Sequence, residues 1–202
     1  MTAIFDYGAG NLRSVENMLS ALGARYEFAR DAESLRRADR IILPGVGHFG
    51  QMMRALDRLG ARGALIERIR AGVPFLGICL GMQALFERSA EAPDASGLGL
   101  FSGSVERFAP GIRAPHMGWN ELELCGSPVL LRGLGDRPYV YFAHSYYVPA
   151  QAAGQRAAAL VKYHITYAAA VEGGNVFGVQ FHPEKSGAAG QRILANFLEG
   201  RF

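Results

Sequence analysis

The sequence has few cysteines, little charge and no long apolar run. The 202 residues include two cysteines, Cys79 and Cys125, which are too few for a disulfide framework. A single disulfide between them remains an alternative, but a reducing compartment fits better. Charged residues make up 19% of the chain, and the arginines behind its net charge of +3 are scattered. Because nucleic-acid-binding surfaces usually carry a concentrated basic patch, we expect no nucleic-acid partner.

The sequence also shows no recognisable targeting signal. The first residues lack a basic region and reach an acid at Asp6, so we expect no signal peptide. No apolar stretch approaches the length that spans a bilayer, and we expect no membrane partner and a cytoplasmic location. The glycine-rich loop at residues 6–11 lacks a full Gly-x-Gly-x-x-Gly, which weakens a dinucleotide interpretation. We expect neither a cofactor nor a metal.

The first half of the chain alternates short apolar strands with helical patterns. The predicted strands cover residues 3–5, 26–28 and 41–43, and an apolar run leads into Cys79. The predicted helices lie within residues 12–22, 52–59 and 65–69, with a break at residues 60–63. This alternation favours a parallel sheet covered on both faces. Asp6, the loop at residues 45–47 and Cys79 then follow strands, along the edge where such sheets bind ligands.

The second half reads as a series of strands. They are predicted at residues 105–108, 121–124, 139–142, 157–163, 168–171 and 176–181. Residues 115–120, which contain the only tryptophan, lie between the first two. Residues 173–175 predict a hairpin turn, and Ser186 is expected to cap a final helix. No linker divides the chain, so we expect one domain over residues 1–202.

The stretch around Cys79 carries the clearest chemical signal. Cys79 stands between Gly77 and Gly81 at the end of an apolar run, in the cysteine counterpart of the strand–nucleophile–helix elbow. A Cβ at either glycine would crowd such a turn, and a helix N-terminus would favour the nucleophilic thiolate. A lone cysteine is more often a buried structural residue, but the glycines and a later histidine favour a nucleophile.

A cysteine nucleophile needs a histidine base, and the histidine needs an orienting carboxylate. His182 directly follows a predicted strand, and Glu184 comes two residues later, so both side chains can project to one side. A histidine at a strand end is more often structural than catalytic. In combination with Cys79, we expect a Cys–His–Glu triad.

These motifs carry a family resemblance. Residues 77–83 (Gly-Ile-Cys-Leu-Gly-Met-Gln) and 182–184 (His-Pro-Glu) resemble the nucleophile and His-x-Glu motifs of class I (triad-type) glutamine amidotransferases. Together with residues 6–11, 44–50, 115–120 and 182–186, they resemble the glutaminase subunits of imidazole glycerol phosphate synthases, from residue 3 to about residue 198. The resemblance implies an α/β, three-layer, flavodoxin-like sandwich around a mostly parallel sheet, with a smaller antiparallel portion.

The resemblance also implies a role for individual residues. Cys79 would attack the side-chain amide of glutamine, His182 would transfer protons, and Glu184 would orient the imidazole. The oxyanion hole would use the Leu80 N–H and one N–H from the loop that contains Val46 and Gly47. The substrate-binding residues would be Gly45, Gln83, His144, Ser145, Tyr146 and Glu91, of which Glu91 also fits an ordinary solvated acid.

A partner is implied by the same resemblance. The family's second subunit is a cyclase with a barrel fold, which forms a heterodimer with the glutaminase and receives its ammonia. Asn11, Met117, Trp119 and Lys185 match segments that face this partner. Without the resemblance, Trp119 would fit core packing equally well.

Two further expectations concern single residues. The glycines around Val46 would let its peptide flip between a state that donates to the oxyanion and one that does not, under control of the partner. His164 stands where the family pattern has glycine after Tyr163, which puts the local turn in doubt and fits a surface-loop histidine.

Other classes of protein remain as alternatives. Amidotransferase subunits of anthranilate, aminodeoxychorismate or pyridoxal phosphate synthesis share the cysteine motif, but the motif at residues 115–120 argues against them. A cysteine peptidase or another hydrolase on a similar sheet would need neither a partner nor glutamine. A regulator that kept only the fold would not need Cys79, His182 and Glu184 together.

Overall fold

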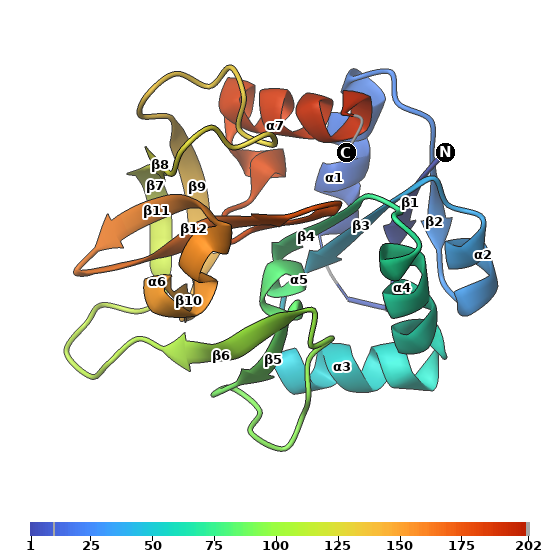
Figure 1. Cartoon of the computed structure of the whole chain (residues 1–202), viewed down its shortest axis with the longest axis horizontal. Coiled ribbons are helices and arrows are strands. Elements are labelled where there is room, and N and C mark those ends of the chain that lie inside the picture. Colours follow the sequence, from blue (N-terminus) through green and yellow to red (C-terminus); the bar gives the residue numbers. More distant parts are fainter. Residues whose placement is uncertain (10, 201–202) are drawn as a thin grey trace.

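The structure is a computed structural model that describes residues 1–9 and 11–200; Gly10 of the expected glycine-rich loop lies outside the described residues. Its centre is a set of five parallel strands. Their order is β2 (Tyr26–Ala29), β1 (Thr2–Phe5), β3 (Arg40–Gly45), β4 (Phe75–Cys79) and β13 (Val176–Val179), and Figure 1 labels β1, β2, β3 and β4 among them. This 2-1-3-4-5 order is that of flavodoxin-like sheets, in which ligands bind beyond the carboxyl ends of the strands.

Antiparallel strands extend the sheet beyond β13. The sheet continues through β12 (Ile165–Gly173), β10 (Tyr146–Pro149), β6 (Phe101–Arg107) and β5 (Phe86–Ser89), of which only the pair β5–β6 is parallel. Strand β11 (Ala157–Tyr163) pairs with β12 and with β8 (Glu123–Leu124). A separate antiparallel ribbon consists of β7 (His116–Glu121) and β9 (Tyr139–His144).

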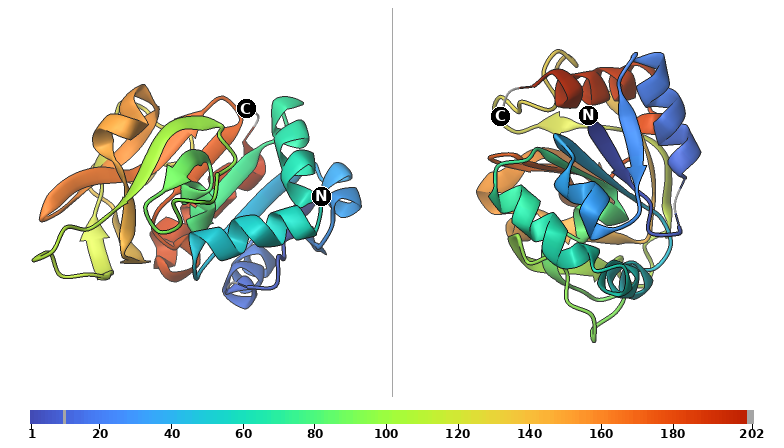
Figure 2. Two further views of the ribbon diagram at one scale, coloured as in Figure 1. Left: turned by 90° about the horizontal axis from the view of Figure 1, so that it is seen from below. Right: turned by 90° about the vertical axis from the view of Figure 1, so that its right-hand side faces the viewer.

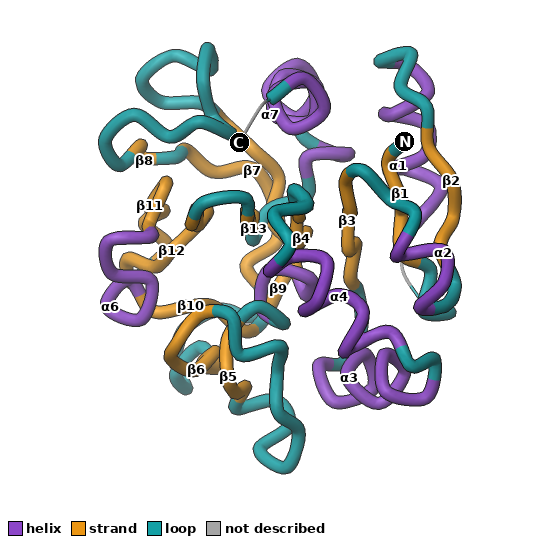
Figure 3. Tube along the Cα trace, turned by 45° about the vertical axis from the view of Figure 1, so that its right-hand side comes forward, coloured by secondary structure: helices purple, strands orange, loops and turns teal. Residues whose placement is uncertain are grey.

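Helices cover both faces of the parallel strands, which gives three layers (Figure 2). One face carries α1 (Leu12–Ala21) and α7 (Gly187–Glu199), and the other carries α2 (Ala32–Arg36), α3 (Phe49–Arg58) and α4 (Ala61–Arg70). Figure 3 shows α7 and α3 on opposite sides of the strands. The remaining helical segments are short: α5 (Leu80–Gln83), α6 (Ala150–Ala153), and the 3-10 turns η1 (Gly154–Arg156) and η2 (Pro183–Lys185).

Alternation along each strand builds two cores. Ile4 and Ile42 pack with α1 and α7, whereas Phe5, Ile41 and Leu43 pack with α3 and α4. All five side chains are buried, and burial of each stabilises the fold by roughly 1.5–3 kcal/mol. The parallel strands therefore read as continuous apolar runs, because both of their faces are covered.

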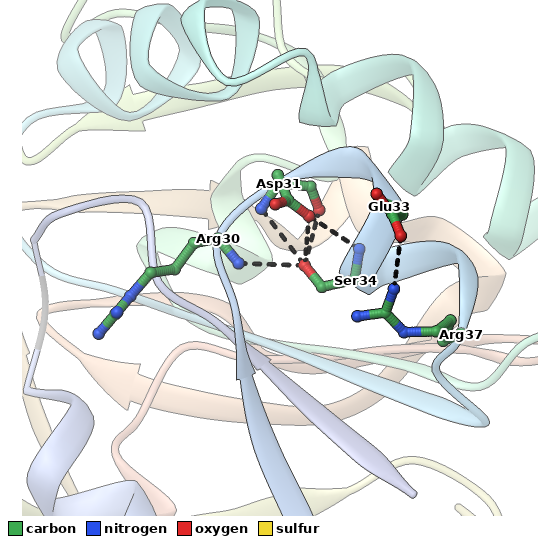
Figure 4. A network of polar contacts seen from close by, with 5 residues as sticks. All are labelled: Arg30, Asp31, Glu33, Ser34 and Arg37. Carbon is green, nitrogen blue, oxygen red and sulfur yellow. Dashed lines mark hydrogen bonds and ion pairs between the residues drawn. The ribbon is translucent and has the colours of Figure 1, made fainter.

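The helix α2 is short and depends on its cap. The Ser34 N–H donates to Asp31 Oδ1 at 2.8 Å, and the Asp31 N–H donates to Ser34 Oγ at 3.3 Å (Figure 4). Arg37 pairs with Glu33 at 2.9 Å, one turn apart. This capping box satisfies two N–H groups that a five-residue helix cannot pair internally.

Most predicted elements are confirmed, and three details are wrong. The break between α3 and α4 falls at residues 59–60, because α4 already begins at Ala61. Residues 115–120 are mainly strand β7, and the strand predicted at residues 121–124 is divided between β7 and β8. Ser186 precedes α7, but its hydroxyl makes no capping hydrogen bond, since it donates to the His182 carbonyl instead. Within residues 1–9 and 11–200, no helix is long and apolar enough to cross a bilayer.

His164 occupies the tight turn between β11 and β12. Its side chain is exposed, as expected, and its φ of 57° lies in the left-handed region that favours glycine. The turn therefore keeps the glycine-type backbone although a histidine stands there.

Candidate active site

Cys79 lies in a strained elbow at the end of β4. Its φ of 54° and ψ of −107° are unusual for a residue with a side chain. A Cβ on Gly77 would lie 2.4 Å from the Gly81 carbonyl oxygen, and one on Gly81 would lie 1.9 Å from the Leu43 carbonyl oxygen. Both glycines are thus required, as the sequence predicts. The helix that follows is a single turn, so its dipole is smaller than expected.

His182 and Glu184 come from the strand beside Cys79. They follow β13, which pairs with β4 in parallel. His182 Nδ1 lies 2.7 Å from Glu184 Oε1, and the two side chains are only 4% and 2% exposed. The backbone of His182 is held by β9: its N–H donates to the Tyr141 carbonyl at 2.8 Å, and Ser186 Oγ bridges the His182 carbonyl and the Tyr141 N–H.

The charge on His182 is stabilised within this group. Burial alone would lower the pKa of His182, but hydrogen bonds to Cys79 and Glu184, and their negative charges, raise it to about 10. The imidazolium therefore persists at neutral pH between a sulfur and a carboxylate. This arrangement can hold a thiolate for attack and a proton for a leaving group.

Gln180 is a site residue that sequence reasoning missed. It is fully buried, and its Nε2 donates to the Cys79 sulfur at 3.6 Å. Its Oε1 accepts from Gln83 Nε2 at 3.0 Å, and the same Nε2 donates to the Tyr146 carbonyl at 2.9 Å. A glutamine two residues before a histidine on an apolar strand carries no signal in the sequence, because only the sheet brings it to Cys79.

A cavity of about 270 Å³ opens beside Cys79. Of the expected site residues, Val46, Gly47, Leu80, Gln83, Glu91, His144, Ser145 and Tyr146 line it. The structure therefore brings together segments from β3, β4, β9 and β10 around the sulfur. Leu80 is the first residue of α5, so its N–H has no partner within the helix and is available to an oxyanion.

Two expected substrate residues have structural contacts that the sequence did not suggest. Gly45 is buried and is not among the residues that line the cavity; a Cβ there would lie 2.7 Å from Leu80 Cβ and 2.8 Å from the Gly81 nitrogen. Glu91 lines the cavity, but its Oε2 also accepts from the Phe49 N–H at the start of α3, at 2.7 Å. Glu91 is thus a fixed carboxylate and not a freely solvated one.

The Val46 backbone is engaged by a tyrosine. The Val46 N–H donates to the Tyr7 hydroxyl at 3.3 Å, and that hydroxyl donates to the Val46 carbonyl at 3.2 Å. Tyr7 is buried, and burial raises the pKa of its hydroxyl to about 12. The hydrogen bond to Val46 lowers this pKa, whereas the negative charge of Cys79 raises it. In the loop expected to supply an N–H to the oxyanion, the Val46 N–H therefore has another partner in this structure.

His144 faces inward from the cavity wall. Burial lowers its pKa to about 3, although the hydrogen bond from its Nδ1 to the Tyr146 carbonyl, at 2.8 Å, acts in the opposite direction. The ring is therefore neutral at physiological pH. It supports the backbone of the cavity-lining residues Ser145 and Tyr146 and does not itself supply charge.

Two of the expected interface residues, Trp119 and Lys185, lie around Tyr141, and Met117 shares a face of β7 with Trp119. Met117 and Trp119 on β7 are 64% and 56% exposed, which is unusual for large apolar side chains. Trp119 packs edge-on against Tyr141 at 6.1 Å, and Lys185 Nζ lies 5.7 Å from the centre of the same Tyr141 ring. Asn11 stands at the start of α1, which contacts η2 and hence the Lys185 turn. In the part of the chain that the structure describes, no group of three or more His, Cys, Asp or Glu is placed to hold a metal.

Comparison with known proteins extends over nearly the whole chain. The family model "Glutamine amidotransferase class-I" matches residues 3–200. The chain is 46% identical to the imidazole glycerol phosphate synthase subunit HisH of Deinococcus radiodurans, over 96% of this chain and 91% of that protein. It is also 46% identical to the subunit of that name from Methanothermobacter thermautotrophicus, over 98% of each chain.

Solved structures show the same fold at lower identity. A structure described as a glutamine amidotransferase superposes with a TM-score of 0.78 at 23% identity, covering 98% of this chain and 97% of that one. The structure of PurLQS from Thermotoga maritima gives a TM-score of 0.74 at 19% identity, covering 98% and 96%. These likenesses establish the architecture around the elbow.

Proposed function

The chain belongs to the class-I glutamine amidotransferase family, and we propose that it is the glutaminase subunit of an imidazole glycerol phosphate synthase in histidine biosynthesis. It hydrolyses glutamine to glutamate and ammonia and passes the ammonia to a cyclase subunit. The observation that carries the proposal is the buried Cys79–His182–Glu184 group at the edge of a cavity. A cytoplasmic location fits the two unpaired cysteines.

The triad supplies the chemistry of amide cleavage. The Cys79 thiolate adds to the side-chain carbonyl carbon of glutamine, and the carbonyl oxygen takes the negative charge. His182 then gives its proton to the amide nitrogen, the C–N bond breaks, and ammonia leaves a glutamyl thioester. The neutral His182 next takes a proton from water, which attacks the thioester and releases glutamate. Glu184 holds the imidazole through Nδ1 during both steps.

The oxyanion is stabilised by backbone N–H groups. Leu80 supplies one, and the Val46–Gly47 segment supplies the other. Loss of one such donor typically lowers the rate by roughly 10²–10³. Because Tyr7 holds the Val46 N–H, we propose that the isolated chain is nearly idle and that partner and ligand binding move this N–H toward the oxyanion.

Glutamine is oriented by residues that line the cavity beside Cys79. Gln83 and the backbone of Ser145 and Tyr146 hold its amino-acid end, with Glu91 as a fixed carboxylate for the ammonium group. The Gln83 amide is itself fixed, because its Nε2 donates to both Tyr146 and Gln180.

The partner docks on the exposed area around Trp119. We propose that the cyclase barrel covers Met117 and Trp119 and pairs with Lys185 and Asn11, forming a heterodimer. Ammonia then reaches the phosphorylated ribulosyl substrate without entering bulk water, and the products are imidazole glycerol phosphate and an aminoimidazole carboxamide ribotide. Exposed tryptophan and methionine are suited to anchor such an interface.

The test is co-purification with a cyclase subunit, followed by a synthesis assay with glutamine or ammonia as nitrogen source. We expect Cys79→Ala to abolish synthesis from glutamine while synthesis from ammonia and partner binding persist. Cys125→Ala, the matched control, should leave both reactions intact. Glutamine-dependent synthesis by Cys79→Ala would overturn the proposal, and hydrolysis of peptides in place of glutamine would favour a peptidase.

A further inference from the structure

We propose that the Tyr167 hydroxyl is a positioning group for the glutamine site, acting through His144 on the Tyr146 carbonyl. The inference rests on the proposed function. Tyr167 is fully buried on β12, and its hydroxyl oxygen lies 2.9 Å from His144 Nε2 and 2.6 Å from His116 Nδ1. None of the triad chemistry uses this hydroxyl, and the motifs of the sequence do not include it.

The direction of each hydrogen bond follows from the partners. A carbonyl oxygen only accepts, so His144 Nδ1 carries the hydrogen that it donates to Tyr146. The ring is neutral, so His144 Nε2 has a lone pair and the Tyr167 hydroxyl donates to it. Having given its hydrogen, the Tyr167 oxygen accepts, and His116 Nδ1–H is the donor. One hydroxyl thus selects the tautomers of two buried histidines.

The chain of bonds continues at both ends. Asn120 Nδ2 lies 3.4 Å from His116 Nε2, which has the lone pair to accept from it, and 3.1 Å from the Lys162 carbonyl. At the other end, the Tyr146 carbonyl also accepts from Gln83, and Gln83 leads through Gln180 to the Cys79 sulfur. The bonds therefore run from β7, the strand that carries Trp119, to the nucleophile.

Packing holds the two imidazoles in place. His116 stacks on Tyr163 at 3.8 Å and on Phe142 at 4.7 Å, with interplanar angles of 9° and 12°. His144 contacts Phe108 and Phe142. Because both rings are buried, each lost hydrogen bond leaves a buried polar group without its partner. Loss of the bond between Tyr167 and His144 therefore acts on the backbone that His144 holds at the Tyr146 carbonyl. That backbone, at Ser145 and Tyr146, faces the cavity.

The test compares two tyrosines of the same neighbourhood. Tyr167→Phe removes the hydroxyl from the chain, whereas Tyr147→Phe removes a hydroxyl that donates only outward, to Glu106 at 3.3 Å. Glutamine hydrolysis is measured with the cyclase complex. We expect Tyr167→Phe to raise the KM for glutamine by about three- to tenfold, with kcat within about twofold, and Tyr147→Phe to match the wild type. An unchanged KM in Tyr167→Phe overturns the inference, whatever happens to kcat.

A second measurement needs no variant. Long-range ¹H–¹⁵N NMR spectra of the unmodified complex at pH 7.5 report the tautomer of each imidazole. We expect both His116 and His144 to carry hydrogen on Nδ1 and not on Nε2. An Nε2–H form at either ring overturns the inference even if Tyr167→Phe does not fold. If the wild type fails to hydrolyse glutamine, the proposed function is wrong. The NMR measurement of the two tautomers still tests the hydrogen-bond chain independently of that result.

Discussion

The Tyr7 hydroxyl binds both polar backbone groups of Val46, accepting from its N–H at 3.3 Å and donating to its carbonyl at 3.2 Å. Val46 lines the cavity and is 38% exposed. The loop that follows has Gly47 at a φ of 96°, so its backbone can rotate where other residues would resist. Tyr7 is therefore the contact that keeps this segment in its present state.

Removal of this contact should activate the isolated chain. We expect Tyr7→Phe to raise glutamine hydrolysis without the cyclase by about two- to tenfold, because one neutral hydrogen bond no longer holds the Val46 N–H away from the oxyanion. The measurement is kcat of the isolated chain. Tyr26→Phe, which loses a hydroxyl bound to Glu16 and Ser20, is the matched control. Equal or lower activity in Tyr7→Phe would mean that Tyr7 supports the active state.

The exposed tryptophan should dominate partner binding. We expect Trp119→Ala to weaken association with the cyclase by about 2 kcal/mol or more, because buried aromatic anchors carry most of an interface's energy. Calorimetry or fluorescence titration gives the Kd. Arg70→Ala, which changes an exposed residue at the end of α4, should not change the Kd. An unchanged Kd for Trp119→Ala would place the interface elsewhere.

Two buried histidines should make the fold sensitive to mild acid. Burial lowers the pKa of His116 to about 4 and of His144 to about 3, below the ordinary 6.5. Between pH 6.5 and about 4 the unfolded chain thus binds protons that the folded chain does not. The stability that the two neutral histidines contribute is complete above pH 6.5 and is lost as the pH falls.

This pH dependence can be measured by urea unfolding at pH 7.5, 6.5, 5.5 and 4.5. Replacing His116 by Gln should reduce the slope of unfolding free energy against pH by up to about 1 kcal/mol per pH unit. His164→Gln, an exposed histidine, should leave the slope as in the wild type. Identical slopes for all three proteins would contradict the assignment of a buried neutral His116.

The turn at His164 should be open to improvement. His164→Gly relieves a left-handed backbone that costs a side-chain residue roughly 1 kcal/mol, so we expect a gain of about that size in unfolding free energy. Gly174→Ala is the reverse control, because Gly174 has a φ of 60° with open space around it; it should lose a similar amount. A lower unfolding free energy in His164→Gly would show that the exposed histidine side chain stabilises the fold.

The sequence predicts the parallel half of the fold well. Strands β1, β3 and β4 are buried on both faces, so their apolar runs are unambiguous, and glycines mark the turns after β3 and β4. Strand β7 is not predicted from the sequence, because its apolar side chains are exposed and a polar one is buried, the reverse of the usual pattern. Met117 and Trp119 point outward and His116 points inward, so the exposed face is the apolar one.

The residues of the site also differ in how far the sequence predicts them. Cys79, His182 and Glu184 are recognisable because each sits in a local motif, and the structure places them together. The roles of Gln180, Tyr7 and Tyr167 are not recognisable, because they arise from contacts between segments far apart in sequence, although Tyr7 lies within the motif at residues 6–11. Hydrogen bonds of this kind depend on tertiary packing and leave no periodic pattern in the chain.

The central claim is that Cys79 is the nucleophile for glutamine, and covalent labelling tests it most directly. The complex with the cyclase is incubated with a glutamine-mimicking electrophile, and the modified residue is identified by mass spectrometry. Both cysteines are free, and Cys125 is the more exposed of the two, so it serves as an internal control. We predict labelling of Cys79 alone, suppressed by excess glutamine. Labelling of Cys125 with Cys79 untouched, or labelling of Cys79 that glutamine does not suppress, would contradict the account.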